Sequence, residues 1–318
     1  MPARRALIVG IDHYENLENI SGCVRDAERM KEVLDTHEGG DPNFFCRVLT
    51  SEKNRPVTEA DLRKALIDLF KKNSTDIFLF YFSGHGIKTK MGTYLAPSNA
   101  RKHNEGVSML DLLYLTQGTK AEEIVIILDS CHSGAAGGFT IDNQVFLQNG
   151  VSILTSSHPD EASKATANGG TFTELVYDAL KGGAADVLGE VNIADVYAYA
   201  DKILRNDDQR PMLKSYVSQL NYLRRNKPKV PKQILRKLID YFDHPKLELP
   251  LTPDYEPELE PHDEVKEAIF KDLQTLRRVN LVEPVGADHM YHAAIHSKSC
   301  RLTPSGRYYW ELAKRGAI

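Results

Sequence analysis

The sequence predicts an α/β protein in which a mostly parallel sheet is flanked by helices and followed by a small α+β domain. Apolar runs rich in Ile, Val and Phe alternate with segments of helical periodicity, the pattern of parallel strands joined by crossover helices. These runs are short and nearly continuous, as in strands buried on both faces. The composition changes after residue 226, where a segment rich in lysine and proline begins.

Each strand is expected as a short apolar run bounded by turn residues or helical segments. The six runs are residues 5–11, 44–50, 76–82, 123–129, 150–155 and 213–218. The helices expected between them are residues 22–37, 58–72, 107–117, 171–181 and 191–205. Residues 86–97 are expected to form a small hairpin at the end of the third strand. Together these elements assign the first domain to residues 1–226.

The second domain is assigned to residues 227–318. After a breaker at 226–231 we expect a short amphipathic helix. Residues 254–264 contain six acidic residues and two prolines, which predicts a solvated linker. Beyond it we expect a helix at 264–279, a β-ribbon at 290–302 and a final helix that opens at Thr303-Pro304, where proline suits the first turn.

Composition excludes several classes of protein. With 42% apolar and 26% charged residues, the chain is typical of a soluble globular protein, and its longest apolar runs are too short to cross a bilayer. It enters the first strand without a secretory signal, so a cytoplasmic protein with no membrane partner is expected. Four cysteines without CxxC spacing predict free thiols and no zinc site. No cofactor is expected. A net charge of -4 gives no general attraction to nucleic acid.

Two of the predicted strands end in sequences that carry chemistry. The third ends in Ser83-Gly84-His85-Gly86, and the fourth in Asp129-Ser130-Cys131-His132-Ser133-Gly134. Active sites of open α/β sheets lie beyond the carboxyl ends of the strands, so His85 and Cys131 are expected to face each other. A cysteine attacks carbonyls as the thiolate, which a neighbouring imidazole promotes. The Gly86 and Cys131 N–H groups would then hold the oxyanion.

Other interpretations of these residues stay open. His85 alone could be a loop residue, and Cys131 alone a buried thiol, since free cysteine is among the most buried residue types. His132 is a rival base, although a residue adjacent to the nucleophile usually points elsewhere. The occurrence of both residues at strand ends favours catalysis.

On these two motifs the sequence resembles the caspase and metacaspase superfamily over roughly residues 4–222. The order and separation also fit, because the histidine lies 46 residues upstream of the cysteine and about 50 is typical of caspases. The resemblance implies a caspase-like fold with a six-stranded, mostly parallel sheet, Cys131 as the nucleophile and His85 as the acid and base. The cysteine motif is that of the metacaspase branch.

A carboxylate next to the nucleophile predicts a pocket for a cation. Asp129 should share a strand face with Cys131, as Ser83 does with His85. The resemblance to metacaspases implies an S1 pocket formed by equivalents of four residues, and hence cleavage after Arg or Lys. The four are Cys23, Asp26, Ser83 and Asp129. Alternatively, Asp26 could favour a helix dipole and Asp129 could bind loop amides.

The sequence also bears on control of activity. Residues 87–104, where calcium-dependent metacaspases carry an acidic cluster, contain no Asp or Glu, so we expect no metal there. Residues 132–150 contain no Lys or Arg, so an enzyme specific for basic residues could not cut itself there. We therefore expect a single uncut active chain. Lys164 is either an autolysis site or a solvated loop lysine.

The C-terminal domain resembles a winged-helix module, on weaker motifs. Residues 265–318 contain nine basic and five acidic residues, too small an excess to establish DNA binding. The module is therefore expected to bind a regulatory protein partner or the peptidase domain itself in preference to nucleic acid. The whole chain is interpreted as a regulated cysteine endopeptidase, by analogy a stress or antiviral effector. The alternative is a catalytically silent scaffold or a protein that binds DNA or a partner. A metal hydrolase would need a clustered His/carboxylate motif, which the sequence lacks.

Overall fold

The computed structural model describes residues 4–51, 53–71, 77–117, 119–131, 147–156, 165–166, 169–204 and 210–318. The chain divides into two compact units. The N-terminal unit comprises Met1–Ala185 and Glu190–Lys227, and the C-terminal unit comprises Asp186–Gly189 and Pro228–Ile318. Across the described residues, no helix has both the length and the apolar character needed to cross a bilayer.

Among the described residues, the N-terminal unit is built on a sheet whose six main strands have the order β11-β7-β6-β3-β1-β2. In chain order these strands are β1 (Arg4–Ile11), β2 (Phe45–Ser51), β3 (Ile77–Thr89), β6 (Glu123–Cys131), β7 (Val151–Thr155) and β11 (Met212–Tyr216). All pairs are parallel except that of β11 with β7. The predicted strands and the mostly parallel sheet are therefore confirmed.

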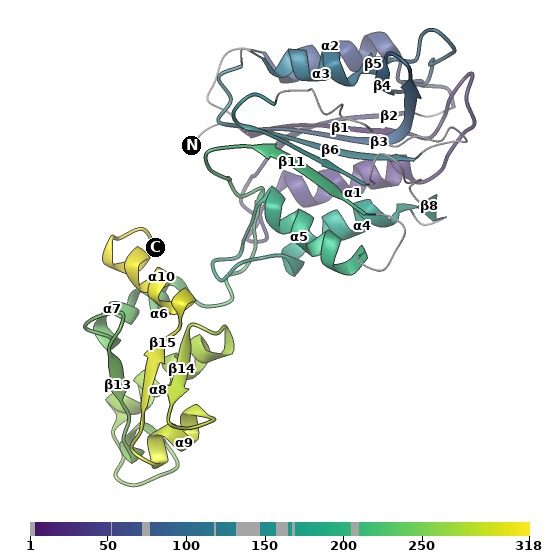
Figure 1. Ribbon diagram of the computed structural model, residues 1–318. Coiled ribbons are helices and arrows are strands. Elements are labelled where there is room, and N and C mark those ends of the chain that lie inside the picture. The colour runs from purple at the N-terminus through teal and green to yellow at the C-terminus, as the bar shows by residue number, and fades with distance from the viewer. Residues whose placement is uncertain are drawn as a thin grey trace. The chain divides into compact units, whose positions relative to one another are not determined.

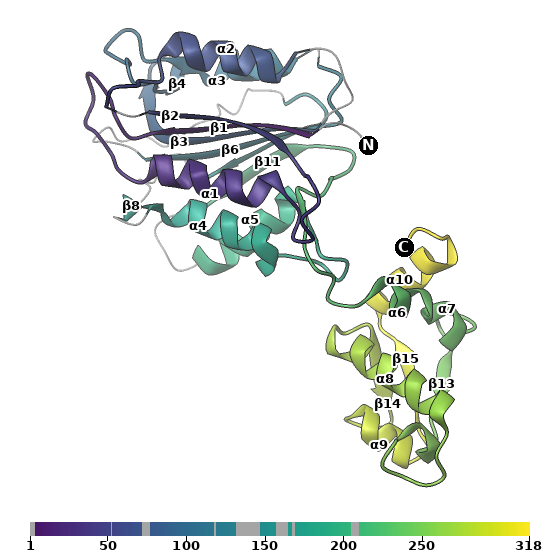
Figure 2. The ribbon, with the colours of Figure 1, turned by 180° about the vertical axis from the view of Figure 1, so that it is seen from behind.

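Helices cover both faces of this sheet (Figures 1 and 2). One face packs against α1 (Cys23–Asp35), α4 (Thr171–Asp178) with the π-helical turn η1 (Ala179–Gly183), and α5 (Ile193–Ile203). The opposite face packs against α2 (Glu59–Leu69) and α3 (Met109–Thr116). In β3, Phe80 and Phe82 pack on the face covered by α2 and α3, whereas Leu79 and Tyr81 pack on the face covered by α1, α4 and α5. The alternation of strand side chains thus divides the apolar residues between two buried layers.

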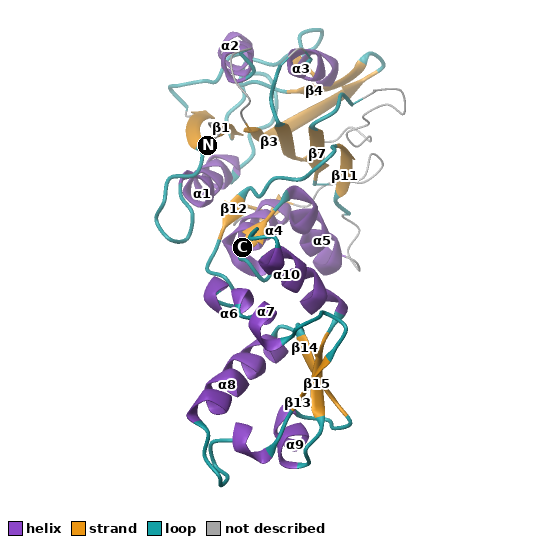
Figure 3. Ribbon diagram, turned by 90° about the vertical axis from the view of Figure 1, so that its left-hand side faces the viewer, coloured by secondary structure: helices purple, strands orange, loops and turns teal. Residues whose placement is uncertain are grey.

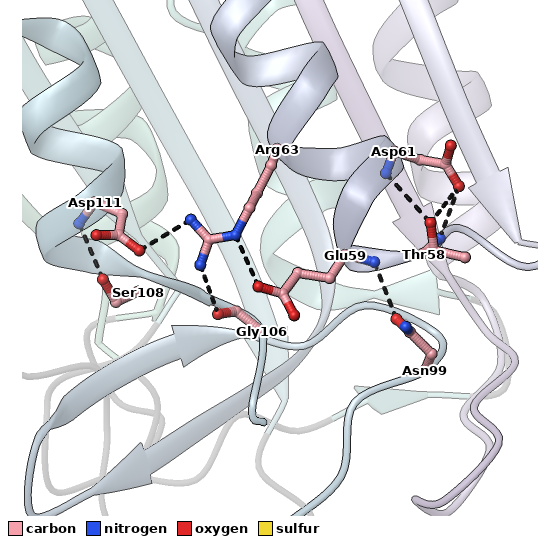
Figure 4. A network of polar contacts seen from close by, with 8 residues as sticks. All are labelled: Thr58, Glu59, Asp61, Arg63, Asn99, Gly106, Ser108 and Asp111. Carbon is pink, nitrogen blue, oxygen red and sulfur yellow. Dashed lines mark hydrogen bonds and ion pairs between the residues drawn. The ribbon is translucent and has the colours of Figure 1, made fainter. Parts of the chain in front are cut away.

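Strand β3 continues beyond its predicted end and forms the expected hairpin. It pairs antiparallel with β4 (Gly92–Leu95), which pairs with β5 (Val107–Ser108). Polar contacts tie this region to α2 (Figure 4). The Arg63 guanidinium binds Glu59 on its own helix, Asp111 on α3 and the carbonyl of Gly106. Short strands elsewhere in the unit are β8 (Ala165–Thr166), β9 (Gly169–Gly170), β10 (Glu190–Val191) and β12 (Arg224–Arg225).

The C-terminal unit has its own apolar core, which includes Phe270 and Trp310. Its sheet within residues 228–318 has the antiparallel order β13-β15-β14 (Figure 3). The strands are β13 (Glu248–Pro250), β14 (Val282–Val285) and β15 (Ser299–Leu302). The helices are α6 (Lys232–Arg236), α7 (Leu238–Tyr241), the 3-10 turn η3 (Pro253–Tyr255), α8 (Glu264–Arg278), α9 (Met290–Ile295) and α10 (Pro304–Lys314). The likeness to a winged helix stays a prediction.

One expectation for the C-terminal region is wrong, and another holds only in part. The first half of the expected ribbon at 290–302 is helix α9, because its buried residues Met290, Ala293 and Ala294 have helical spacing. The ribbon is instead formed by β14 and β15. Residues 254–264 are solvated over most of their length, but Tyr255 is buried and its ring packs against Phe270 at 6.3 Å between centroids.

Candidate active site

The carboxyl end of β6 lies beside residues 83–85 of β3 in matched register. Ser83 is opposite Asp129, and His85 is opposite Cys131. Residues in register on neighbouring parallel strands fall on the same face of the sheet, and positions 83, 85, 129 and 131 continue the face of Tyr81. The backbone therefore brings together the two sequence motifs that were expected to meet.

His85 is held in one orientation by the loop that follows β1. Its side chain is buried, and Nε2 lies 2.7 Å from the carbonyl oxygen of Glu18. A carbonyl only accepts, so Nε2 carries the proton, and in the neutral ring Nδ1 is then an acceptor. Nδ1 is buried and has no hydrogen-bond partner among the described residues. The ring thus presents an uncommitted base on the side away from Glu18.

Tyr14, from the same loop, supports the strand at this point. Its hydroxyl accepts a hydrogen bond from the His85 backbone N–H at 2.7 Å, and the two ring centroids are 4.6 Å apart. A Cβ at position 84 would lie 2.8 Å from the tyrosine hydroxyl, so glycine is needed there for this approach. The loop itself is anchored by hydrogen bonds from the backbone N–H of Tyr14 to Asn19 and from that of Glu15 to the Ser98 carbonyl.

Two residues at the end of β1 position the start of α1. The Asp12 carboxylate accepts the backbone N–H groups of Cys23 and Val24, at 2.8 and 3.2 Å. It thereby caps the helix from a distance, since Gly22 at the N-cap has no side chain to do so. A Cβ at Gly10 would lie 2.3 Å from the Cys23 carbonyl oxygen, so glycine lets the helix approach the strand. The first turn of α1 is thus held against the strand ends.

Two carboxylates gather beside the His85 and Cys131 positions. Asp26, in the first turn of α1, is 2% exposed, and its Oδ2 lies 3.5 Å from the Ser83 hydroxyl. Asp129 is 3% exposed. The pKa of Tyr81 is raised well above its ordinary value, first by burial and then by the charges of Asp129 and Asp26. Both carboxylates therefore lie close enough to act on the hydroxyl of Tyr81.

Asp129 is held by α4 but not neutralised by it. Its Oδ2 accepts the hydroxyl of Thr173 at 2.6 Å and the backbone N–H of Thr173 at 3.3 Å. Burial raises its pKa, while hydrogen bonds from Thr173 and Ser156 oppose the rise. Every described group that shifts this pKa is uncharged. The carboxylate is thus desolvated without a described cation to compensate it, a costly arrangement that a cationic ligand would relieve.

The remaining sequence-derived residues are placed as follows. Gly86 lies in β3, one residue beyond His85 and opposite Leu95 of β4. Cys23 is 6% exposed at the start of α1, and a thiolate there would also raise the pKa of Tyr81. The thiol of Cys131, residues 132–146 with His132, and Lys164 lie outside the part of the chain whose side chains are described. No cluster of His, Cys, Asp and Glu that could hold a metal ion occurs among the described residues.

Sequence reasoning missed Tyr14, Glu18, Asp12 and Thr173. Glu18 acts through its backbone, which no side-chain pattern reveals. The others donate to or accept from residues far along the chain, and no local motif marks such contacts. The alternative roles of the two acids also find support. Asp26 lies in the first turn of a helix, where it favours the dipole, and Asp129 accepts the backbone N–H of Thr173.

Comparison with known proteins decides the family. The family model for the caspase domain matches residues 3–222, most of the chain. The chain belongs to the caspase-domain family. Curated relatives include Metacaspase-1 of Plasmodium falciparum, 30% identical over 152 residues, which cover 42% of this chain and 24% of that protein. Metacaspase-6 of Arabidopsis thaliana is 26% identical over 185 residues, 55% of this chain and 48% of that protein. The chain thus spans at most about half the length of these two relatives.

Solved structures share the fold of the N-terminal unit. Protein GSU0716 of Geobacter sulfurreducens aligns with a TM-score of 0.52 at 18% identity and covers 71% of this chain and 98% of its own. Caspase-1 of Spodoptera frugiperda aligns with a TM-score of 0.50 at 15% identity and covers 71% and 91%. The caspase-like α/β fold expected from the sequence is therefore confirmed, with the metacaspases as relatives.

Proposed function

We propose that the protein is a cysteine endopeptidase that cleaves after Arg or Lys, with Cys131 as nucleophile and His85 as its acid and base. The observation that supports this most strongly is the matched register of His85 and Cys131 on adjacent strands, with Nδ1 of the buried histidine left as an acceptor. A thiol next to an uncommitted imidazole nitrogen is the arrangement that nucleophilic cysteine catalysis requires.

The reaction follows from these groups. Nδ1 of His85 takes the proton of the Cys131 thiol, and the thiolate attacks the carbonyl carbon of the scissile peptide bond. The carbonyl oxygen becomes an oxyanion, which the N–H groups of Gly86 and Cys131 stabilise. The C–N bond then breaks, the leaving amine takes the proton from Nδ1, and a thioester remains. Water attacks the thioester, gives its proton to Nδ1, and the released thiolate is reprotonated.

Glu18 acts in this scheme as a positioning group. Its carbonyl fixes the proton on Nε2 and keeps the acceptor nitrogen directed away from the loop. When Nδ1 takes the thiol proton, the ring becomes a cation, and the same carbonyl stabilises the positive charge through a charge-assisted hydrogen bond. Tyr14 supports the backbone of the same residue.

The preference for basic substrates rests on the acidic pocket. Asp129 and Asp26 are the charged members, and Ser83 and Cys23 complete the pocket. Buried carboxylates recognise a guanidinium or an ammonium group through charge-assisted hydrogen bonds. An acidic residue at the cleaved position would instead be repelled. We further propose that the C-terminal unit regulates the peptidase by binding a protein partner, which its separate apolar core supports.

The test uses short fluorogenic peptides that end in Arg, Lys or Asp. We expect the wild-type chain to turn over the Arg and Lys peptides but not the Asp peptide, and Cys131→Ala to turn over none. The matched control is Cys46→Ala, which removes a thiol of β2 whose pKa is raised by burial; its activity should equal that of the wild type. Failure to cleave any of the peptides would favour a silent scaffold, and a preference for Asp would reject the pocket assignment.

A further inference from the structure

The C-terminal unit has an acidic hollow of about 420 Å³, lined by α8 and by the two residues that follow η3. Three carboxylates line it, those of Glu256, Glu264 and Glu267. Its apolar lining comes from Pro257, Ala268 and Phe270. A hollow that combines apolar walls with carboxylates suits a ligand with an apolar stem and a cationic head.

Glu256 sets this hollow apart from an ordinary acidic surface. Its side chain is only 7% exposed, and its buried Oε2 has no hydrogen-bond partner among the described residues. A buried carboxylate oxygen without a partner is costly and requires an explanation. Burial raises the pKa of Glu256, and the neighbouring charges of Glu258 and Glu267 raise it further. Binding of a cation would relieve both effects.

The other charges around the hollow do not satisfy Glu256. Glu264 and Glu267 lie in the first turn of α8, where acids also favour the helix dipole. Glu267 is 3.0 Å from the ring Nδ1 of His262. Lys271 lines the hollow, yet forms no described contact with Glu256. The helix dipole thus accounts for two of the three carboxylates. Glu256 precedes the helix and is left unexplained.

We propose that this hollow binds a lysine or arginine side chain presented by a partner protein. The cationic head would meet Glu256 and Glu264, and the aliphatic stem would lie against Pro257, Ala268 and Phe270. A bare divalent ion fits less well, because it needs six or more oxygen ligands at close range and the described residues form no metal-binding group. The site lies in the C-terminal unit. It rests on the proposed role of that unit in binding a protein partner, and its test does not depend on peptidase activity.

The test follows the Ala268 methyl resonance in the full-length Cys131→Ala chain labelled with [¹³C]methyl-alanine. The probe is N-acetyl-arginine-N-methylamide. We expect a saturable shift of the Ala268 signal, weakened at least tenfold in affinity by Glu256→Gln. The exposed Glu264→Gln should weaken it too, which keeps the test valid if the first variant unfolds. Glu311→Gln, which removes a carboxylate on α10 outside the hollow, is the matched control and should bind as the parent does.

Two further titrations distinguish a basic side chain from an apolar ligand and from a metal ion. N-acetyl-norleucine-N-methylamide carries the stem without the charge and should leave the Ala268 signal unmoved. Calcium chloride should also leave it unmoved. An equal shift with the norleucine probe, a shift with calcium that the arginine probe cannot displace, or no shift with the arginine probe would each overturn the assignment.

Discussion

Replacing Asp129 by asparagine isolates the charge of the proposed specificity pocket. The side chain is almost completely buried and accepts two hydrogen bonds from Thr173. Asparagine has nearly the same volume, and its amide oxygen can still accept both. The substitution therefore removes the negative charge and leaves the packing against α4 in place.

The expected loss follows from the burial of this carboxylate. Removing one member of a buried ion pair costs about 3 to 5 kcal/mol. Asp26 stays in the pocket, so the lower figure of about 3 kcal/mol applies, and this corresponds to about a 10²-fold fall in kcat/KM for Arg and Lys peptides. The loss should appear mainly in substrates with a basic residue at the cleaved position.

The free energy of unfolding of Asp129→Asn should not fall along with kcat/KM. The pKa of Asp129 is raised above its ordinary value of 3.8. The folded state therefore binds the proton more tightly than the unfolded state, and the stability that protonation provides is lost as pH rises through the raised pKa. At neutral pH the charged carboxylate is a cost, so Asp129→Asn should keep or increase the free energy of unfolding.

The assay combines steady-state kinetics on fluorogenic Arg and Lys peptides with urea unfolding at pH 7. Asp243→Asn, the same substitution at an exposed position of the C-terminal unit, is the matched control and should match the wild type in both. A kcat/KM for Asp129→Asn within threefold of the wild-type value would refute the reasoning. A large kinetic loss that comes with lower stability would also refute it, because misfolding would then explain the change.

The remaining predictions concern the support of the site and the state of the chain. Tyr14→Phe leaves the buried His85 N–H without its acceptor, so urea unfolding should report a loss of about 1 to 3 kcal/mol, together with a lower kcat; unchanged values would contradict the role of the hydroxyl. Gly10→Ala forces a Cβ against the Cys23 carbonyl and should displace the start of α1. The free energy of unfolding should fall by about 1 to 3 kcal/mol, and KM for Arg peptides should rise. An unaltered KM would argue against the placement of α1 in the pocket. The active chain should remain uncut between residues 132 and 150, and intact-mass measurement of the active protein would expose an obligatory cut there.

The sequence predicted the sheet well because its strands are strongly apolar. Runs such as Ile77–Phe82 are buried on both faces, so burial alone marks them as strands. Helix α1, with Asp26 in its first turn, and Asp129 near the end of β6 were also predicted, since each depends on local periodicity or on a motif. The meeting of His85 and Cys131 followed from the rule that parallel strands end at one edge of the sheet.

What the sequence could not predict depends on contacts between distant residues. The Glu18 carbonyl and the Tyr14 hydroxyl reach His85 through the fold of a loop without a regular pattern. In the C-terminal unit, the acidic composition around Tyr255 suggested a solvated linker, yet that single ring is buried against Phe270. Composition averages over a segment, while packing is decided by individual side chains.

Covalent labelling by a peptidyl-arginine chloromethyl ketone tests the central claim most directly, because it requires both the nucleophile and the acidic pocket. Mass mapping of the full-length protein should find one equivalent attached to Cys131. The His85→Ala variant should not be labelled, and the corresponding aspartyl reagent should not label the wild-type protein. Labelling at Cys23, Cys46 or Cys300 in place of Cys131, or equal labelling by the aspartyl reagent, would contradict the account.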